Sequence, residues 1–282
     1  MRAILIRAYG GPEVLKLEEV ARPEPAEDEV LIRVVAASIN PVDVAIRKGY
    51  VAKLLGGFPL ILGMDAAGTV EKVGNKVTNC KAGDPVFAFF TLKRQGGYAE
   101  FVTAKQEEFA LKPSTVSFAQ AAGVGAAGST AWEALVDTAN LRAGQTVLIH
   151  GGSGGVGHFA IQIAKARGAK VFATASTANQ EFLRQMGADV PIDYTRTKFE
   201  DVAKDVDVVL DTVGRDTLER SYGVVKKGGI RQANGSEKAY AGHLADFYNG
   251  GRGSGAGTNR DWPHARKDRF KDRERTGPLI GL

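Results

Sequence analysis

The first third of the chain alternates short apolar runs with turns rich in glycine, proline and aspartate. The apolar runs are rich in β-branched and aromatic residues, and they occupy Ala3–Ile6, Val30–Val35, Ala67–Gly74, Pro85–Phe90 and Tyr98–Val102. Short strands at such intervals are typical of a small β-barrel. We therefore predict a β-barrel domain over residues 1–112.

The pattern changes after Lys112-Pro113. Phe118 to Val136 is alanine-rich and predicts a helix that is interrupted near Gly123–Gly125. Strands then alternate with helices that begin near Gly155, Gln180 and Thr217, the strands lying at Thr146–Ile149, Lys170–Ala175, Val190–Tyr194 and Val206–Thr212. This alternation predicts an α/β fold with a parallel sheet over residues 113–230.

The periodic pattern ends near residue 230. Residues 231–282 contain no valine, and they include the run GGRGSGAG and a mixed charge run from Arg266 to Arg275. We expect Arg231–Asn234 to break the last strand after Ile230, and the tail to be mostly disordered. Its composition suggests an altered C-terminus or a different reading frame.

The composition of the 282 residues narrows the class of protein. The net charge is +5, but ten Lys/Arg and six Asp/Glu lie in residues 231–282, so most of the excess belongs to the tail. No apolar run is long enough to span a membrane, and the N-terminus does not resemble a signal peptide. The single cysteine, Cys80, cannot form an internal disulfide, which favours a cytoplasmic location.

The segment between the first and second strands of the α/β region carries the strongest chemical signal. It contains Gly152, Gly154 and Gly157 in the spacing G-x-G-x-x-G, between a strand and a helix. We expect Gly152 to turn the chain, Gly154 to admit a diphosphate and Gly157 to let the helix approach the sheet. The helix N-terminus would present free amides to the phosphates, so the predicted cofactor-binding residues also include Ser153, Gly155 and Val156.

Two alternatives apply to this loop. It could be a tight strand-to-helix turn of another α/β protein, since glycines also collect in ordinary turns. A phosphate-binding P-loop is disfavoured, because His158-Phe159 stands where Gly-Lys-Ser/Thr would be required.

Several segments, in this order and spacing, resemble the zinc-free quinone oxidoreductases, the zeta-crystallin-like branch of the medium-chain dehydrogenase/reductase superfamily. They are the glycine loop, Ala37–Asp43, Leu62–Gly68, Val77–Val86, Thr130–Leu135 and Asp211–Gly214. The resemblance implies a GroES-like β-barrel domain and a Rossmann domain with the active site between them. It also implies NADPH-dependent reduction of quinones or α,β-unsaturated carbonyls, without zinc.

The zinc ligands of related dehydrogenases are missing from the sequence. Those relatives have a catalytic cysteine near Ile39-Asn40 and a histidine at the position of Met64, and their structural zinc needs four cysteines. We therefore expect no metal. His158 is better explained as a first-turn residue of its helix than as a catalyst.

The choice between NADPH and NADH is predicted from the end of the second strand. Thr174–Thr177 contains no acidic residue to accept the ribose hydroxyls, so we favour NADPH, with Ser176 as a hydrogen-bond donor to its 2′-phosphate. The resemblance adds Tyr194 at the adenosine end. Ser176 and Thr177 could instead cap the helix that follows.

The resemblance places Asn40 and Thr130 near the nicotinamide, with Val213 and Gly214 lining its pocket and Tyr50 beside the substrate. Asn40 could equally be a turn residue before Pro41. Tyr50 could be an ordinary surface tyrosine, and Asp43 and Asp65 are expected to be structural. No catalytic triad is needed, since hydride transfer is the chemistry of the cofactor.

The leading functional hypothesis is an NADPH-dependent quinone or enone reductase that acts on small molecules. The alternative is an NADPH-binding protein with little turnover, which an altered C-terminus would produce. The acidic residues and sparse aromatics of the tail argue against nucleic-acid binding, and no membrane partner is expected. Relatives form homodimers through the strand that would follow residue 230, and the altered tail is not expected to support that contact.

Overall fold

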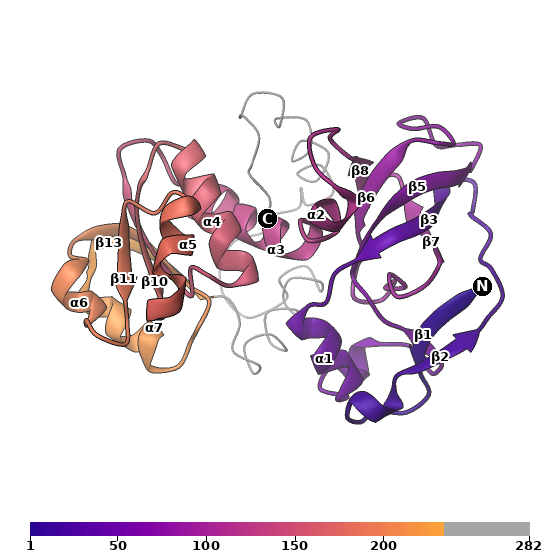
Figure 1. The fold of residues 1–282 in the computed structure, drawn as a ribbon, viewed down its shortest axis with the longest axis horizontal. Helices are drawn as coiled ribbons and strands as arrows, with labels where there is room; N and C mark the ends of the chain where they lie inside the picture. Colours follow the sequence, from indigo (N-terminus) through magenta and orange to yellow (C-terminus); the bar gives the residue numbers. More distant parts are fainter. Residues whose placement is uncertain (234–282) are drawn as a thin grey trace. The chain divides into compact units, whose positions relative to one another are not determined.

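The computed structural model describes residues 1–233 (Figure 1). These residues form two compact units, residues 1–126 and residues 127–233, which we call unit 1 and unit 2. The expectations about disorder, an altered C-terminus and a lost dimer contact concern the tail, which apart from residues 231–233 lies outside the described residues. None of the helices described in residues 1–233 has the length and apolarity of a membrane span.

Unit 1 is built on two antiparallel sheets. The smaller has the strand order β2-β1-β4 and the larger has the order β7-β3-β5-β6-β8. The strands are β1 (Arg2–Ile6), β2 (Lys16–Glu19), β3 (Glu29–Ala37), β4 (Leu60–Ile61), β5 (Asp65–Val73), β6 (Pro85–Phe89), β7 (Phe101–Lys105) and β8 (Phe109–Leu111). Four of the five predicted apolar runs coincide with β1, β3, β5 and β6.

The fifth run was predicted as a strand over Tyr98–Val102, but β7 begins only at Phe101. The Tyr98 backbone bonds elsewhere, because its amide donates to the Leu62 carbonyl and its carbonyl accepts from Ile4. Ala99 forms an isolated bridge with Ala3. The start of the run therefore pairs with the small sheet, and only its second half joins the large one.

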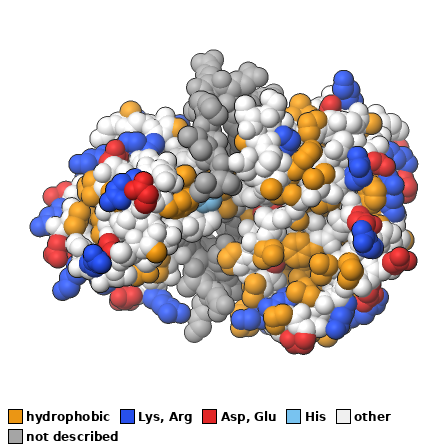
Figure 2. All heavy atoms as spheres, in the orientation of Figure 1, with side chains coloured by type: hydrophobic (Ala, Val, Ile, Leu, Met, Phe, Trp, Pro, Cys, Tyr) orange, Lys and Arg blue, Asp and Glu red, His pale blue; other side chains and the backbone are white. Residues whose placement is uncertain are grey.

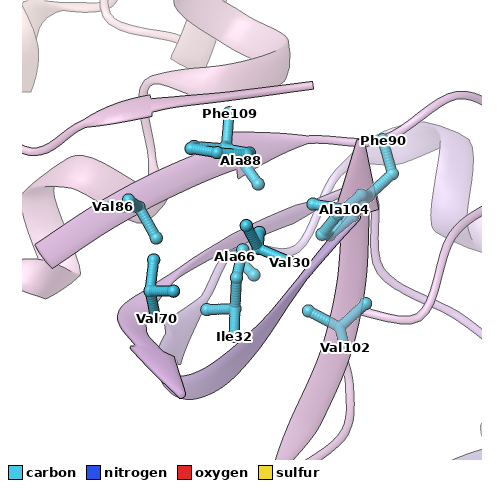
Figure 3. Packing of buried hydrophobic residues seen from close by; sticks show 10 residues of the cluster. All are labelled: Val30, Ile32, Ala66, Val70, Val86, Ala88, Phe90, Val102, Ala104 and Phe109. Carbon is cyan, nitrogen blue, oxygen red and sulfur yellow. The ribbon is translucent and has the colours of Figure 1, made fainter. Parts of the chain in front are cut away.

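The core of unit 1 lies between the strands of the larger sheet (Figure 3). Aliphatic and aromatic side chains from five strands meet there, namely Val30, Ile32, Ala66, Val70, Val86, Ala88, Phe90, Val102, Ala104 and Phe109. Phe90 and Met64 come from the ends of their strands and are almost completely buried. Burial of side chains of this size contributes roughly 1.5–3 kcal/mol each before conformational entropy is counted.

Short helices flank the sheets of unit 1. They are the 3-10 turns Pro12–Val14 and Ala52–Leu54 and the helices α1 (Pro41–Arg47) and α2 (Phe118–Ala122). Ser117 and Gln120 form a reciprocal capping box at the start of α2, with Gln120 N donating to Ser117 Oγ over 3.1 Å. Ala121 and Ala122 then pack on Ala67 and Phe87 of the large sheet.

The alanine-rich segment divides where the sequence predicts a break. Helix α2 ends at Ala122, and α3 (Gly125–Trp132) follows it. The last predicted turns are not α-helical, since Glu133–Thr138 forms a π-helix. Its Ala139 amide reaches back to the Ala134 carbonyl over 3.0 Å, and such a widened turn leaves no signature in hydrophobic periodicity.

Unit 2 is a five-stranded parallel sheet with the order β11-β10-β9-β12-β13. The strands are β9 (Thr146–His150), β10 (Lys170–Ala175), β11 (Val190–Asp193), β12 (Val206–Asp211) and β13 (Val225–Ala233). The helices are α4 (Gly155–Ala166), α5 (Gln180–Gln185), α6 (Phe199–Val202) and α7 (Asp216–Arg220), with 3-10 turns at Thr177–Asn179 and Ser221–Gly223. The four predicted strands are confirmed to within one residue at each end.

Apolar side chains cover one face of this sheet. Phe199 of α6 packs with Leu148, Phe172 and Val209, which point to the same side of their strands. Helix α4 buries Phe159, Ala160, Ile161, Ile163 and Ala164, because it packs against β9 and β10 and also against the π-helix Glu133–Thr138. Val156 in its first turn is only half-buried.

The prediction that the last strand breaks after Ile230 is wrong. β13 continues to Ala233, with Arg231 opposite Val209 and Gln232 opposite Leu210. Strand pairing uses backbone N–H and C=O groups, so the polar side chains of Arg231 and Gln232 do not prevent it on this edge strand of the described sheet. The Arg231 guanidinium lies 3.0 Å from the centre of the Tyr222 ring, a cation–π contact.

Charges are mixed over the surface. Figure 2 shows basic and acidic side chains interspersed on the visible face of each unit. Several of them form exposed ion pairs, including Arg22–Glu71 and Lys72–Glu24 in unit 1 and Lys165–Asp189 in unit 2. Pairs this exposed contribute little to the free energy of folding.

Candidate active site

The turn from β9 into the glycine loop is made by Gly151. Its φ of +68° lies in the left-handed region, and a Cβ there would come within 2.4 Å of Thr212 Oγ1. Gly152, which the sequence predicts to make the turn, lies within it, but the left-handed conformation belongs to Gly151. The spacing motif identifies the loop, but it does not say which of two adjacent glycines turns the chain.

Gly152 and Gly157 are needed for close packing. A Cβ on Gly152 would lie 2.9 Å from Leu183 and 3.1 Å from Ala173, so this glycine lets the loop approach α5 and β10. A Cβ on Gly157 would lie 2.2 Å from the Gly151 carbonyl oxygen. Gly157 therefore lets the first turn of α4 lie against Gly151, the residue that directly follows β9.

Gly154 and Gly155 form the open part of the loop. Both are exposed, and around a Cβ on Gly154 the nearest atom is the Gly151 carbonyl oxygen at 3.2 Å. The first hydrogen bond into α4 is from the His158 amide to the Gly154 carbonyl, so the amides of Gly155, Val156 and Gly157 precede the helical ladder. This arrangement fits a diphosphate: free amides, the positive end of a 12-residue helix and no side chain in the way.

His150 is a buried histidine directly before the glycine loop, and the sequence did not predict a role for it. His150 ends β9, is 1% exposed, and its Nδ1 and Nε2 lie 3.2 Å from Thr174 Oγ1 and Ser221 Oγ. The Ser221 hydroxyl donates to the Thr217 carbonyl, so Nε2–H donates to Ser221 and Nδ1 accepts from Thr174. Burial lowers the pKa of His150 to about 4, against a smaller opposing effect of Asp211. The ring is neutral at physiological pH and links β9 to β10 and to the 3-10 turn Ser221–Gly223.

The turn after β12 lies next to the glycine loop. A Cβ on Gly151 would come within 3.3 Å of Val213 Cγ2, and Thr212 Oγ1 donates to the His150 carbonyl over 2.7 Å. Asp211 Oδ1 accepts the amides of Val213 and Gly214 over 2.8 and 2.9 Å. Gly214 has a φ of +76°, and the Val213 side chain is 49% exposed. The loop and the predicted pocket residues Val213 and Gly214 therefore share one edge of the sheet.

Ser176 and Tyr194 follow β10 and β11 at that same carboxyl edge. The Ser176 hydroxyl accepts from Asn179 Nδ2 over 3.2 Å, which leaves its own proton available to a ligand. Ser176 occupies the N-cap position of the short turn Thr177–Asn179, but its side chain does not cap it. The Tyr194 side chain is largely exposed, and its amide bonds the Ala175 carbonyl, which ties the ends of the two strands together.

Asn40 of unit 1 lies in a buried polar network. It occupies the N-cap position of α1, and its Nδ2 donates to Asp65 Oδ2 over 2.8 Å and to Ser38 Oγ over 3.0 Å. Ser38 donates to the same Asp65 oxygen, and the Ala126 amide donates to Asp65 Oδ1 over 2.8 Å. An ionised carboxylate only accepts hydrogen bonds, so Asp65 fixes the orientation of the Asn40 amide. The Asn40 Nδ2 therefore faces Asp65 and Ser38, and the orientation of the amide is fixed.

Asp65 is completely buried and has no cationic partner in this network. Burial raises the pKa of Asp65 to about 6, although the hydrogen bonds from Ser38, Asn40 and Ala126 act in the opposite direction. A Cβ on Gly125 would lie 2.3 Å from Asp65 Oδ1, so the glycine lets the start of α3 approach the carboxylate. The structural role expected for Asp65 agrees with this geometry.

Asp43 is a second buried carboxylate, within α1. It accepts from the Asn40 amide over 2.7 Å, from the Tyr98 hydroxyl over 2.9 Å and from the Gly63 amide over 3.3 Å. Burial raises the pKa of Asp43, and burial together with Asp43 raises that of Tyr98. Asp43 thus secures the start of α1 and, through it, the position of Asn40.

The remaining predicted site residues are Tyr50 in unit 1 and Thr130 in unit 2. Tyr50 of unit 1 is 54% exposed, with Lys48 Nζ 5.6 Å from its ring centre. Thr130 is a half-buried residue of α3 in unit 2. Met64 is buried where zinc-dependent relatives have a histidine, and within residues 1–233 no three or more His, Cys, Asp or Glu side chains are grouped as a metal site.

Comparison with known families defines the class of protein. Residues 26–141 match the alcohol dehydrogenase GroES-like domain, and residues 155–233 match the zinc-binding dehydrogenase domain. These matches and the two kinds of sheet confirm the predicted architecture of a GroES-like domain and a Rossmann-type domain.

Individual relatives narrow the class further. The chain is 44% identical over 238 residues to the chloroplastic NADPH-dependent alkenal/one oxidoreductase of Arabidopsis thaliana, the match covering 81% of this chain and 61% of that protein. It is 40% identical to the quinone oxidoreductase of Mus musculus, over 81% of this chain and 71% of that protein. The crystal structure of Escherichia coli quinone oxidoreductase complexed with NADPH superposes with a TM-score of 0.73 at 30% identity, covering 89% of this chain and 86% of that one. The chain belongs to the quinone oxidoreductase branch of the medium-chain dehydrogenase/reductase superfamily.

Proposed function

We propose that this protein is an oxidoreductase that transfers hydride from NADPH to a quinone or an α,β-unsaturated carbonyl compound, without zinc. The supporting observation is the open start of α4 at Gly154 and Gly155, where the amides of Gly155 and Val156 precede the helical ladder on the same sheet edge as Val213 and Ser176. Two of the similar proteins are an NADPH-dependent oxidoreductase and a quinone oxidoreductase solved in complex with NADPH, which supports the choice of cofactor. In this proposal residues 1–112 form the substrate domain and residues 113–230 the NADPH-binding domain.

The residues of unit 2 hold and orient the cofactor in this proposal. The amides of Ser153 and of Gly155–Gly157 bind the diphosphate, which Gly154 leaves room for. Ser176 and Tyr194 bind the adenosine end, and Val213 and Gly214 border the nicotinamide, with Thr130 near it. Asp211 keeps the Val213–Gly214 turn in shape through its two amide hydrogen bonds. When bound, NADPH supplies a hydride, which is two electrons and one proton.

The residues of unit 1 act on the substrate side. Asn40 is held in one orientation, because its Nδ2 donates to Asp65 and Ser38. In this proposal it hydrogen-bonds the carboxamide of the cofactor or a product hydroxyl, and Tyr50 flanks the substrate. A solvent proton completes the reaction: on oxygen for a quinone, or on the α-carbon when the hydride has gone to the β-carbon of an enone.

The proposal is tested by following NADPH fluorescence on mixing and then NADPH consumption with benzoquinone and with a short-chain enone. We expect saturable binding, and turnover with at least one of the two substrates. Absence of binding would refute the cofactor assignment. Binding without turnover would leave an NADPH-binding protein, and oxidation of simple alcohols in place of quinone or enone reduction would contradict the reaction type.

A further inference from the structure

An acidic side chain of the neighbouring strand β11 lies beside the end of β10. Asp193 is the last residue of β11 and is in register with Ala175, the last residue of β10. The end of the second strand is where an acidic residue selects NADH by accepting a ribose hydroxyl, and where its absence favours NADPH. The residues directly after Ala175, 176–180, include no acid. The parallel pairing with β11 places one beside them.

Two threonine hydroxyls hold the Asp193 carboxylate. Thr177 Oγ1 donates to Oδ2 over 2.6 Å, and Thr195 Oγ1 donates to Oδ1 over 2.6 Å. The Thr195 amide adds a third hydrogen bond to Oδ1 over 3.0 Å, and the two hydroxyl oxygens lie 3.0 Å apart. We call Thr177, Asp193 and Thr195 the hydroxyl clamp.

The clamp keeps the carboxylate ionised and fixes its orientation. The hydrogen bond from Thr177, followed by that from Thr195, lowers the pKa of Asp193. Arg196 Nε lies 3.8 Å from Oδ2, and 75% of the Arg196 side chain is exposed, so a cation beside the clamp offsets its charge. Each carboxylate oxygen is held by a threonine hydroxyl, so the carboxylate cannot turn toward an incoming ribose without breaking these bonds.

We propose that the hydroxyl clamp determines the dinucleotide preference, by tying the Asp193 carboxylate into the β10–β11 edge so that it neither accepts a ribose 2′-hydroxyl nor faces a 2′-phosphate. The inference rests on the proposed dinucleotide binding and identifies the residues that set its specificity. Without the two hydroxyls, the carboxylate is free to turn toward the ribose. It then stabilises NADH and repels the phosphate of NADPH.

The test measures dissociation constants of NADPH and NADH, by nucleotide fluorescence, for the wild type and for Thr177→Val with Thr195→Val. Both threonines are exposed, and valine keeps their shape while removing the hydroxyl. We expect the double variant to bind NADPH about tenfold more weakly, whereas NADH affinity stays equal or rises. Adding Asp193→Asn to the double variant removes the charge and should restore NADPH affinity.

The matched control is Thr197→Val, which removes an exposed hydroxyl from the same turn that makes no contact with the Asp193 carboxylate in the described structure. It should leave both constants unchanged. An unchanged ratio of NADPH to NADH affinity in the double variant, or equal loss of both, would overturn the clamp. A wild type that binds neither dinucleotide would instead refute the proposed function.

Discussion

At the scale of single residues, the buried carboxylate of Asp65 fixes the orientation of the candidate site residue Asn40. The sequence left Asn40 open between a turn residue and a site residue, and its place in the structure is compatible with either. It occupies the N-cap position of α1, and its amide is oriented by Asp65. Residue type alone cannot give this orientation, because it depends on a contact between residues 25 positions apart.

Asn40→Asp tests the network without reference to activity. The change removes two N–H donors and places a second carboxylate against Asp65, so we expect a loss of about 2–4 kcal/mol of unfolding free energy at about pH 8. The loss should shrink toward about pH 5, where the pair holds a proton. Asn75→Asp, at an exposed position, is the matched control in urea titrations. Equal, pH-independent effects of the two substitutions would contradict the assignment.

At the scale of elements, regular patterns predict strands and helices well and special turns poorly. Strand β10 was predicted with both ends correct, since a buried parallel strand is a continuous apolar run bounded by turn residues. The π-helix at Glu133–Thr138 and the last three residues of β13 were missed, because each depends on backbone pairing that side-chain polarity does not encode.

The glycine loop shows the same limit within the candidate site. Its location and its motif follow from the sequence, but the turn glycine is Gly151, and Gly152 and Gly157 have packing partners that only the fold supplies. His150 and Asp193 were also missed, since their partners come from other strands. An acidic residue near the end of a predicted strand was the one available signal for Asp193.

The loop predicts two separable substitution effects. Gly154→Asp should leave folding intact, because Gly154 occupies an N-cap position where aspartate is favoured and has a φ of −79°. It should nevertheless weaken NADPH binding at least about a hundredfold, since it places a negative charge in the diphosphate cradle. Unchanged affinity, measured by NADPH fluorescence, would refute the cradle.

Gly157→Ala should behave in the opposite way. Its Cβ would collide with the Gly151 carbonyl oxygen, so we expect about 1–3 kcal/mol of destabilisation in thermal or urea unfolding. Gly223→Ala is the control, because a Cβ there meets no atom within 4 Å and its φ is not positive. A Gly157 variant as stable as the Gly223 variant would contradict the packing described for the loop.

At the scale of the whole molecule, the two units contain buried titratable groups with opposite pH dependence. The folded pKa of Asp65 is raised to about 6 from 3.8, so its contribution to stability is present below about pH 4 and is lost as the pH rises through 6. The folded pKa of His150 is lowered to about 4 from 6.5, so its contribution is present above about pH 6.5 and is lost as the pH falls through 4. Each shift corresponds to roughly 3 kcal/mol.

Between about pH 4 and pH 6.5, acidification should therefore favour unit 1 and disfavour unit 2. Hydrogen exchange followed by mass spectrometry should show slower opening of β3 and β5 at the acidic end of this range and faster opening of β9 and β12. Asp65→Asn keeps the acceptor for the Ala126 amide and should abolish the trend in unit 1 alone. His150→Gln should abolish it in unit 2 alone. A common pH dependence of both units, unaltered by either substitution, would show that neither buried group controls local stability.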